Sequence, residues 1–178
     1  LPENTSFQSR TDEMCGFNVA GPKSREILQR LSNQDLSNKN WPFMRSGNLS
    51  IAGVSCLALR ISFTGDLGWE IYCETSKQQI VYEALVQEAI NERGGPVGSR
   101  ALMSLRIEKG YGSWSREYSP EVWPHECGLE KLCKLDKEFL NKGELEKKLK
   151  TNPRERLMLI HLNEEDCISS NADATGGE

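Results

Sequence analysis

Long apolar runs are missing from this sequence of 178 residues. No stretch approaches the ~20 apolar residues that a membrane-spanning helix needs, and no segment has the apolar core of a secretory signal. A strong charge of either sign is missing as well, since the formal net charge is −4. Such a charge gives no general attraction to nucleic acid or to an anionic membrane surface, so we expect neither as a partner.

The residue patterns of metal sites and of nucleophilic enzymes are also missing. No C-x-x-C is present, and the two histidines, His125 and His161, stand in no ligand pattern. No Ser-His-Asp or Cys-His arrangement and no G-x-G-x-x-G fingerprint can be recognised. We expect no metal site, and several cysteines fall in apolar stretches, which favours buried, reduced thiols. The cysteines are Cys15, Cys56, Cys73, Cys127, Cys133 and Cys167.

The length allows either one domain with a real core or a piece of a larger protein. The chain begins at Leu1, its first methionine is Met14, and it finishes with a polar segment soon after an apolar run. We therefore expect a fragment that is truncated at both ends.

Strand and helix periodicities alternate along the chain, which predicts an α+β fold with mixed or antiparallel sheets and packed helices. Residues 47–63 predict two strands with a turn at Ala52 and Gly53, and a further strand follows residue 67. Ser76 and Gln79 predict a capping box at the start of a helix over residues 76–92. Further helices are expected over 22–31, 99–109 and 141–150, and a strand that is apolar on both faces is expected over 156–162.

The segment RISFTGDLGWEIY, residues 60–72, contains a carboxylate among large apolar residues. A period of two places Trp69 and Ile71 on one face of the strand, and Glu70 with Tyr72 on the other. A carboxylate beside an aromatic ring suits a flat ligand with an amidine-like edge, such as a pterin or guanine, because its two oxygens can accept two parallel N–H bonds.

A plainer interpretation of Glu70 stays open. Most strand carboxylates face solvent, and Glu70 could also pair with Arg60 or Arg106. The glycine-bracketed TGDLG predicts an ordinary turn between the two strands.

Five segments of the sequence occur in the same order in one known family. They are VAGPKSREIL, RISFTGDLGWEIY, ALMSLRIEKGYGSW, SPEVWPHECGLEKLCKLDKEFLNKGEL and NADATGGE. On these segments the chain resembles the folate-binding aminomethyltransferase-type domains, which form the T-protein of the glycine cleavage system and the C-terminal half of dimethylglycine and sarcosine dehydrogenases. GWEIY and the EKGYxxW pattern are more similar to the dehydrogenase branch. The resemblance implies a T-protein-like folate-binding domain followed by the start of a C-terminal β-barrel.

The resemblance also implies which side chains bind the cofactor, tetrahydrofolate. In the family the Glu of the G-W-E motif holds the pterin ring, and Glu70 matches it. Tyr72 matches a nearby folate-contacting position of the dehydrogenases, while Phe63 and Trp114 would line or shape the pocket. The family's catalytic Asp lies upstream of VAGPKSREIL, where no matching motif remains, so no catalytic residue is expected in this chain.

Several positions depart from the family pattern. Leu102 stands where the T-protein has a folate-binding Arg, as the dehydrogenase branch would have it. Phe63 keeps the ring of the usual Tyr but loses its hydroxyl, and Asp66 replaces the commoner Glu. Gly112 stands where an Arg is usual, and His125 stands where a Leu is usual. These changes concern the detailed geometry of the pocket, and the resemblance to the family does not depend on them.

The implied parent is an FAD-dependent dehydrogenase of N-methylated glycine, either dimethylglycine or sarcosine. Its flavin domain, outside this chain, would oxidise the methylamine, and the folate domain would capture the one-carbon unit as methylene-tetrahydrofolate. The fragment alone would be inactive. Two alternatives stay open: the aminomethyltransferase of glycine cleavage, and a non-catalytic regulatory relative.

The same resemblance divides the chain. Residues 1–150 would form the tetrahydrofolate-binding domain, truncated at its start, and residues 151–178 would begin the barrel. The partner would be a small-molecule substrate, a methylated amine or an aminomethyl group. The compartment would be the mitochondrial matrix or the bacterial cytoplasm.

Overall fold

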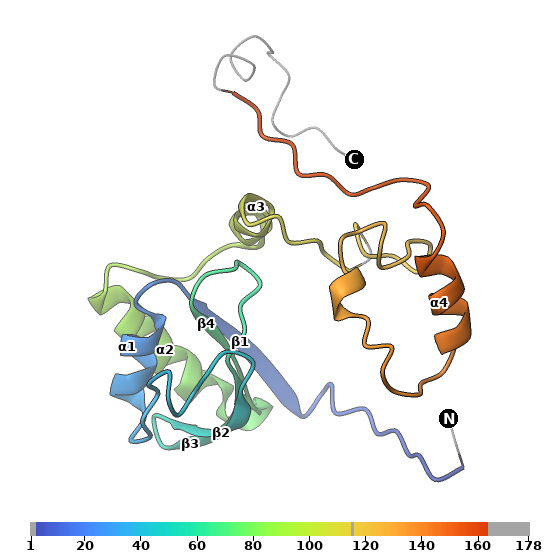
Figure 1. Cartoon of the computed structure of the whole chain (residues 1–178). Coiled ribbons are helices and arrows are strands. Elements are labelled where there is room, and N and C mark those ends of the chain that lie inside the picture. Colours follow the sequence, from blue (N-terminus) through green and yellow to red (C-terminus); the bar gives the residue numbers. More distant parts are fainter. Residues whose placement is uncertain (1–2, 115, 164–178) are drawn as a thin grey trace. The chain divides into compact units, whose positions relative to one another are not determined.

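The computed structural model describes residues 3–114 and 116–163. The chain forms two compact units, Leu1–Tyr111 and Gly112–Glu178, and each is described by itself (Figure 1). The expected domain boundary after residue 150 concerns the architecture of a longer protein and stays a prediction.

One antiparallel four-stranded sheet organises the first unit, with the strand order β1-β4-β3-β2. Its strands are β1 (Met14–Ala20), β2 (Ser46–Ile51), β3 (Val54–Leu59) and β4 (Gly68–Glu74). Ala52 and Gly53 join β2 to β3 with φ angles of 49° and 81°, as a tight hairpin requires. The expected antiparallel sheet with packed helices is confirmed for this unit.

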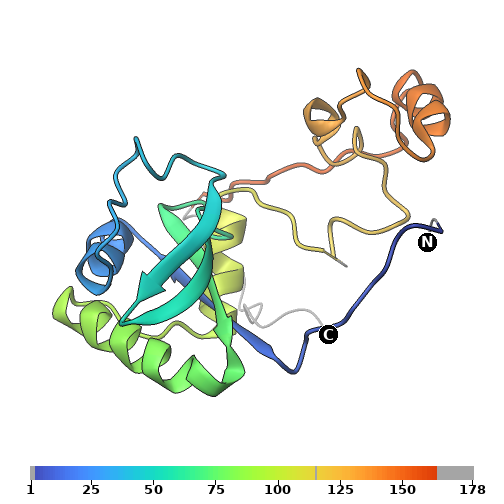
Figure 2. The ribbon, with the colours of Figure 1, turned by 90° about the horizontal axis from the view of Figure 1, so that it is seen from below.

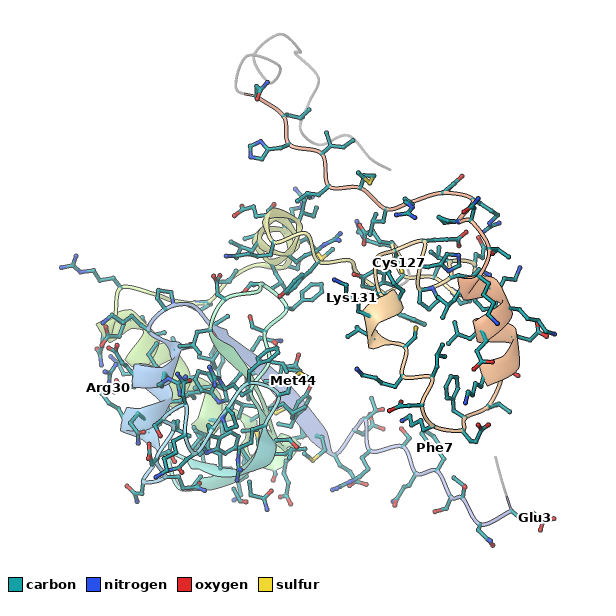
Figure 3. All side chains as sticks on the ribbon, viewed as in Figure 1. Glu3, Phe7, Arg30, Met44, Cys127 and Lys131 are labelled. Carbon is teal, nitrogen blue, oxygen red and sulfur yellow. The ribbon has the colours of Figure 1, made fainter. Side chains whose placement is uncertain are left out.

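Two helices cover one face of the sheet: α1 (Ser24–Leu31) and α2 (Gln78–Asn91) (Figures 1 and 2). Arg30 of α1, labelled in Figure 3, forms ion pairs with Glu88 and Glu92 of the α2 region. Beneath the helices lies the apolar core. Its largest fully buried side chains include Trp69, Ile71, Leu28, Leu36, Leu49, Ile51 and Val81.

The start of α2 differs from the sequence prediction. Ser76 lies in a short 3-10 turn over Thr75–Lys77, and no side chain caps the helix that begins at Gln78. The backbone N–H of Gln78 donates to the carbonyl of Thr75, and the turn moves the N-cap to Lys77, so Ser76 does not stand at the position from which a capping box acts. The predicted capping box is therefore wrong.

The apolar stripe of α2 is narrower than its sequence indicates. Val81 and Leu85 are buried, while Ile80 and Ile90 are 49% and 55% exposed. A further helix, α3 (Ser99–Glu108), follows, with Gly98 at its N-cap. Arg106 of α3 is buried and donates to the carbonyl of Tyr111 at 2.9 Å.

The second unit contains little regular structure. A 3-10 turn spans Glu130–Leu132, and the helix α4 spans Lys142–Leu149, as the charged segment predicted (Figure 1). Residues 156–162 form no strand, and the side chains of Leu157 to Leu162 are exposed, with Ile160 at 78%. The N–H of Leu157 donates to the carbonyl of Glu126 at 2.8 Å, but no described strand pairs with this run, and a strand needs such a neighbour along its length. The start of a barrel stays a prediction.

Candidate functional site

Strand β4 divides its side chains between two environments, as the period of two predicted. Trp69, Ile71 and Cys73 point into the helix-covered core and are at most 1% exposed. Glu70 and Tyr72 are half-buried and stand on the opposite face. The structure therefore brings together the two site residues for which the sequence argument was strongest.

A hydrogen bond joins these two side chains. The phenol of Tyr72 donates to Oε2 of Glu70 at 2.7 Å. This bond, with a contribution from burial, raises the pKa of Tyr72, because removing the phenol proton would place two negative oxygens together. Within the described residues no protein group donates to the second oxygen of Glu70, Oε1, and Oε2 keeps a further lone pair.

The register of the sheet determines which residues lie beside Glu70 on its face of the sheet. Asn18 of β1 and Leu59 of β3 are its Cα partners on either side. Residues directly opposite one another in a sheet share a face, so an amide and an aliphatic side chain flank the carboxylate.

The residues opposite Tyr72 in the two neighbouring strands carry no polar side chain. Its Cα partners are Gly16 of β1 and Leu57 of β3, and the side chain of Leu57 is 43% exposed. A Cβ at Gly16 would lie 2.9 Å from Cε1 of Tyr72, so the tyrosine ring lies directly over this glycine. An aromatic ring and aliphatic groups beside one carboxylate form a surface that suits a flat, hydrogen-bonding ring system.

Sequence reasoning missed Gly16, Asn18, Leu57 and Leu59 as members of this surface. The alternation of β3 placed Leu57 and Leu59 on one face. Their meeting with β4, and that of β1, depends on which strands pair, and no local pattern contains that information.

Arg60 does not pair with Glu70, contrary to one of the plainer interpretations. Its Nη1 donates to the carbonyl of Trp41 at 2.6 Å, and its guanidinium lies 5.8 Å from the ring centre of Trp69. Burial, followed by the charge of Arg25, lowers the pKa of Arg60. Arg25 also lies over the ring of Trp69, at 5.2 Å, so these charges belong to the core side of β4.

Phe63 lies in a different environment from Glu70. Strand β3 ends at Leu59, where the N–H of Ile61 turns back to the Leu59 carbonyl, so the strand alternation that was expected to reach Phe63 stops four residues short. Phe63 lines a cavity of about 700 Å³ bordered by β1, α2 and α3, together with Leu102. Glu70 and Tyr72 are not among the residues that line this cavity.

The connection from β3 to β4 is held in place at several points. Ser62 and Thr64 share a hydrogen bond of 2.9 Å between their hydroxyls, and Asp66 pairs with Lys109 at 3.4 Å. Gly65 has a φ of 75°, a conformation that favours glycine, as predicted for the TGDLG turn. These contacts fix the entry into β4.

Trp114, the fourth predicted site residue, belongs to the second unit. Its side chain is 74% exposed, and its backbone forms an isolated bridge with Tyr118. Its place in a ligand pocket stays a prediction.

A polar anchor organises the second unit. The carboxylate of Glu126 accepts bonds from the backbone N–H of Trp123 at 2.9 Å and from Nε of Arg154 at 3.2 Å. These contacts lower the pKa of Glu126 to about 2. They border a cavity of about 190 Å³ that also includes His125 and Lys148. We attribute a structural role to this cluster, since Arg154 contacts both Glu126 and the carbonyl of Glu121 and so joins residues 121–126 to residue 154.

Comparison with known proteins identifies the family of the chain. Residues 1–137 match the family described as the GCVT N-terminal domain. The chain belongs to this family.

Its curated relatives include dehydrogenases and aminomethyltransferases. The chain is 35% identical to the mitochondrial dimethylglycine dehydrogenase of Mus musculus over 88% of its own length, and 38% identical to the mitochondrial sarcosine dehydrogenase of the same species over 87%. It is 35% identical to the aminomethyltransferase of Thermoanaerobacter sp. (strain X514) over 78%. It spans only 18%, 17% and 38% of these three proteins, respectively.

A solved structure also resembles part of the chain. The match to the heterotetrameric sarcosine oxidase from Corynebacterium sp. U-96 covers 50% of this chain and 44% of the oxidase chain, with a TM-score of 0.43 and 19% sequence identity. In the part of the chain that the structure describes, no helix has the length and apolar character needed to cross a membrane. No cluster of three or more His, Cys, Asp or Glu side chains among residues 3–114 and 116–163 could hold a metal ion.

Proposed function

We propose that this chain is the tetrahydrofolate-binding portion of an FAD-dependent dehydrogenase that oxidises N-methylated glycine. The names of its relatives support this assignment, because dimethylglycine and sarcosine dehydrogenases match most of the chain. FAD would belong to a part of the parent protein outside this sequence. The bound tetrahydrofolate would supply the acceptor that takes up the oxidised methyl group as a methylene unit.

The observation that carries the proposal is the Glu70–Tyr72 pair on an aliphatic sheet face. The 2-amino group and adjacent ring N–H of a pterin present two parallel donors, and a carboxylate accepts such a pair with both oxygens. Oε1 of Glu70 receives no hydrogen bond from the described residues. Oε2 already accepts the bond from Tyr72 and has a second lone pair that can accept an N–H of the ligand. The residues present therefore fit the proposed ligand.

The other side chains would have supporting roles. Tyr72 would hold the carboxylate in position and offer its ring edge, while Leu57 and Leu59 would contact the ligand's apolar surface. Phe63 lines a different cavity from the Glu70–Tyr72 surface, and the proposed roles of Phe63 and Trp114 in ligand binding rest on the family resemblance alone. No residue of the chain is proposed to move a proton during the reaction.

An aminomethyltransferase of the glycine cleavage type is the second candidate, and the 35% identity to a bacterial aminomethyltransferase favours it. Leu102 argues against it, because the transferases use an Arg at the matching position to help bind folate. The dehydrogenase assignment places the protein in the mitochondrial matrix or the bacterial cytoplasm, with a small methylated amine as substrate.

Titration of the full-length protein with tetrahydrofolate tests the proposal. Glu70→Gln keeps the shape of the side chain and removes its charge, so we expect the Kd to rise about tenfold to a hundredfold. Glu74→Gln is the matched control, since Glu74 lies on the same strand and is exposed. Isothermal calorimetry gives both constants. Equal affinities for the wild type and Glu70→Gln would show that Glu70 does not hold the ligand.

A further inference from the structure

Three thiols gather on the core side of the sheet, away from the Glu70–Tyr72 surface. Cys15 lies on β1, Cys56 on β3 and Cys73 on β4, and all three are free thiols. Cys56 and Cys73 are 2% and 1% exposed, whereas Cys15 is half-buried. The sequence predicted buried, reduced thiols, but three cysteines so far apart in the chain gave no sign that they meet.

The geometry selects one pair among the three. Cys15 and Cys73 are Cα partners in the antiparallel β1–β4 pairing, and their sulfur atoms lie 3.4 Å apart. A disulfide bond has an S–S length of about 2.05 Å, so rotation of the two side chains covers most of the remaining distance. Cys56 also lies close enough to Cys73 to interact with its thiol, but Cys56 directs its own S–H to the carbonyl of Val54, at 3.5 Å.

The two cysteines of this pair differ in their exposure to solvent. β1 lies at one end of the strand order, and its Cys15 keeps contact with solvent. Cys73 lies in the apolar core, and desolvation together with its thiol neighbours raises its pKa to about 12. Because thiolates react with oxidants and buried thiols are protected, an oxidant would reach Cys15 first.

We propose that Cys15 and Cys73 form a dithiol–disulfide site that a hydroperoxide closes and a small dithiol reopens. The Cys15 thiolate attacks one oxygen of hydrogen peroxide, the O–O bond breaks, and Cys15 sulfenic acid and water result once a proton is taken up. The Cys73 sulfur then attacks the Cys15 sulfur, the S–O bond breaks, and the proton of Cys73 leaves with the hydroxide as water. In sum, two thiols and one peroxide give one disulfide and two waters.

The disulfide would join two adjacent strands and close a loop of the intervening chain. It would lie one residue from both Gly16 and Tyr72 in the same two strands. Such a bond constrains the unfolded chain, so the oxidised protein would unfold at a higher temperature than the reduced one.

Peptide mapping of the full-length protein tests the site. The folded protein is exposed to graded hydrogen peroxide, its remaining thiols are alkylated, and the unreduced digest is analysed by mass spectrometry. We expect a peptide pair that joins Cys15 to Cys73 and disappears after treatment with dithiothreitol. A dominant Cys56–Cys73 pair, or sulfinic acid at Cys15 without any cross-link, would overturn the proposal.

Variants supply the second readout. Cys15→Ser and Cys73→Ser should each abolish the cross-link and the oxidation-dependent rise in Tm, which we expect to be roughly 5–10 °C in the wild type. Cys56→Ser and Cys133→Ser, which is in the second unit, should keep both. The wild-type map does not depend on the folding of any variant, so it decides the question if Cys73→Ser is unstable. A cross-link that persists in Cys15→Ser would contradict the assignment.

Discussion

The two units of this chain are organised by opposite kinds of interaction. The first unit buries an apolar core beneath α1 and α2, with Trp69 and Ile71 almost completely hidden. Among the described residues of the second unit, only Glu126 is buried, and it is held by hydrogen bonds and an ion pair. The first unit therefore depends on the area removed from water, which is insensitive to pH, and the second depends on a charge state.

The largest expected effect is on the apolar core. Trp69→Ala removes a large ring from the centre of the sheet and leaves a cavity, so we expect the free energy of unfolding to fall by about 3–5 kcal/mol. Urea denaturation followed by circular dichroism measures it. Leu140→Ala, at a position in the second unit that is 89% exposed, is the control and should change little. Similar losses in the two variants would contradict the contrast drawn between the units.

Acid should affect the second unit selectively. The pKa of Glu126 is lowered to about 2 from an ordinary value of 4.5, so its stabilising contribution is fully present above pH 4.5 and is lost as the pH falls toward 2. We expect the second unit to lose order over this window, as followed by the amide NMR signals of Trp123 and Arg154. Glu126→Gln should lack the charge at every pH and remove this transition. A transition that persists in Glu126→Gln would assign it to another carboxylate.

The smallest expected effect is at the contact between β1 and Tyr72. Gly16→Ala would place a methyl group 2.9 Å from the tyrosine ring, so the ring must move, and we expect a loss of about 1 kcal/mol in stability. The displaced phenol should also weaken its bond to Glu70, which lowers the pKa of Tyr72 toward its ordinary value, measurable by ultraviolet titration. Gly47→Ala is the matched control, because its nearest contact would be 3.7 Å. An unchanged Tyr72 titration in Gly16→Ala would show that the ring does not depend on this glycine.

The sequence predicted local features well where the burial of one face decides them. The alternation across Trp69, Glu70 and Ile71 is confirmed by their burial, because one face of β4 meets the core. The hairpin at Ala52 and Gly53 is confirmed because its backbone conformation demands particular residues. Helix positions were also found to within a few residues.

Features that depend on distant parts of the chain could not be predicted. The expected second strand reaches only Leu59, since the backbone turns at Ile61 where pairing with β4 has ended. The pairings that place Gly16 and Asn18 beside the Glu70–Tyr72 pair follow from strand order, which periodicity does not contain. The strand expected over residues 156–162 likewise has no neighbouring strand among the described residues.

The hydrogen bond from Tyr72 limits the rotational freedom of the Glu70 carboxylate. A free glutamate must give up rotational freedom when it grips a partner, which costs about 0.5–1.5 kcal/mol for a flexible side chain. Here the phenol has already restricted that motion during folding. A molecule that meets this carboxylate therefore encounters a preorganised acceptor, and more of its interaction energy remains as affinity.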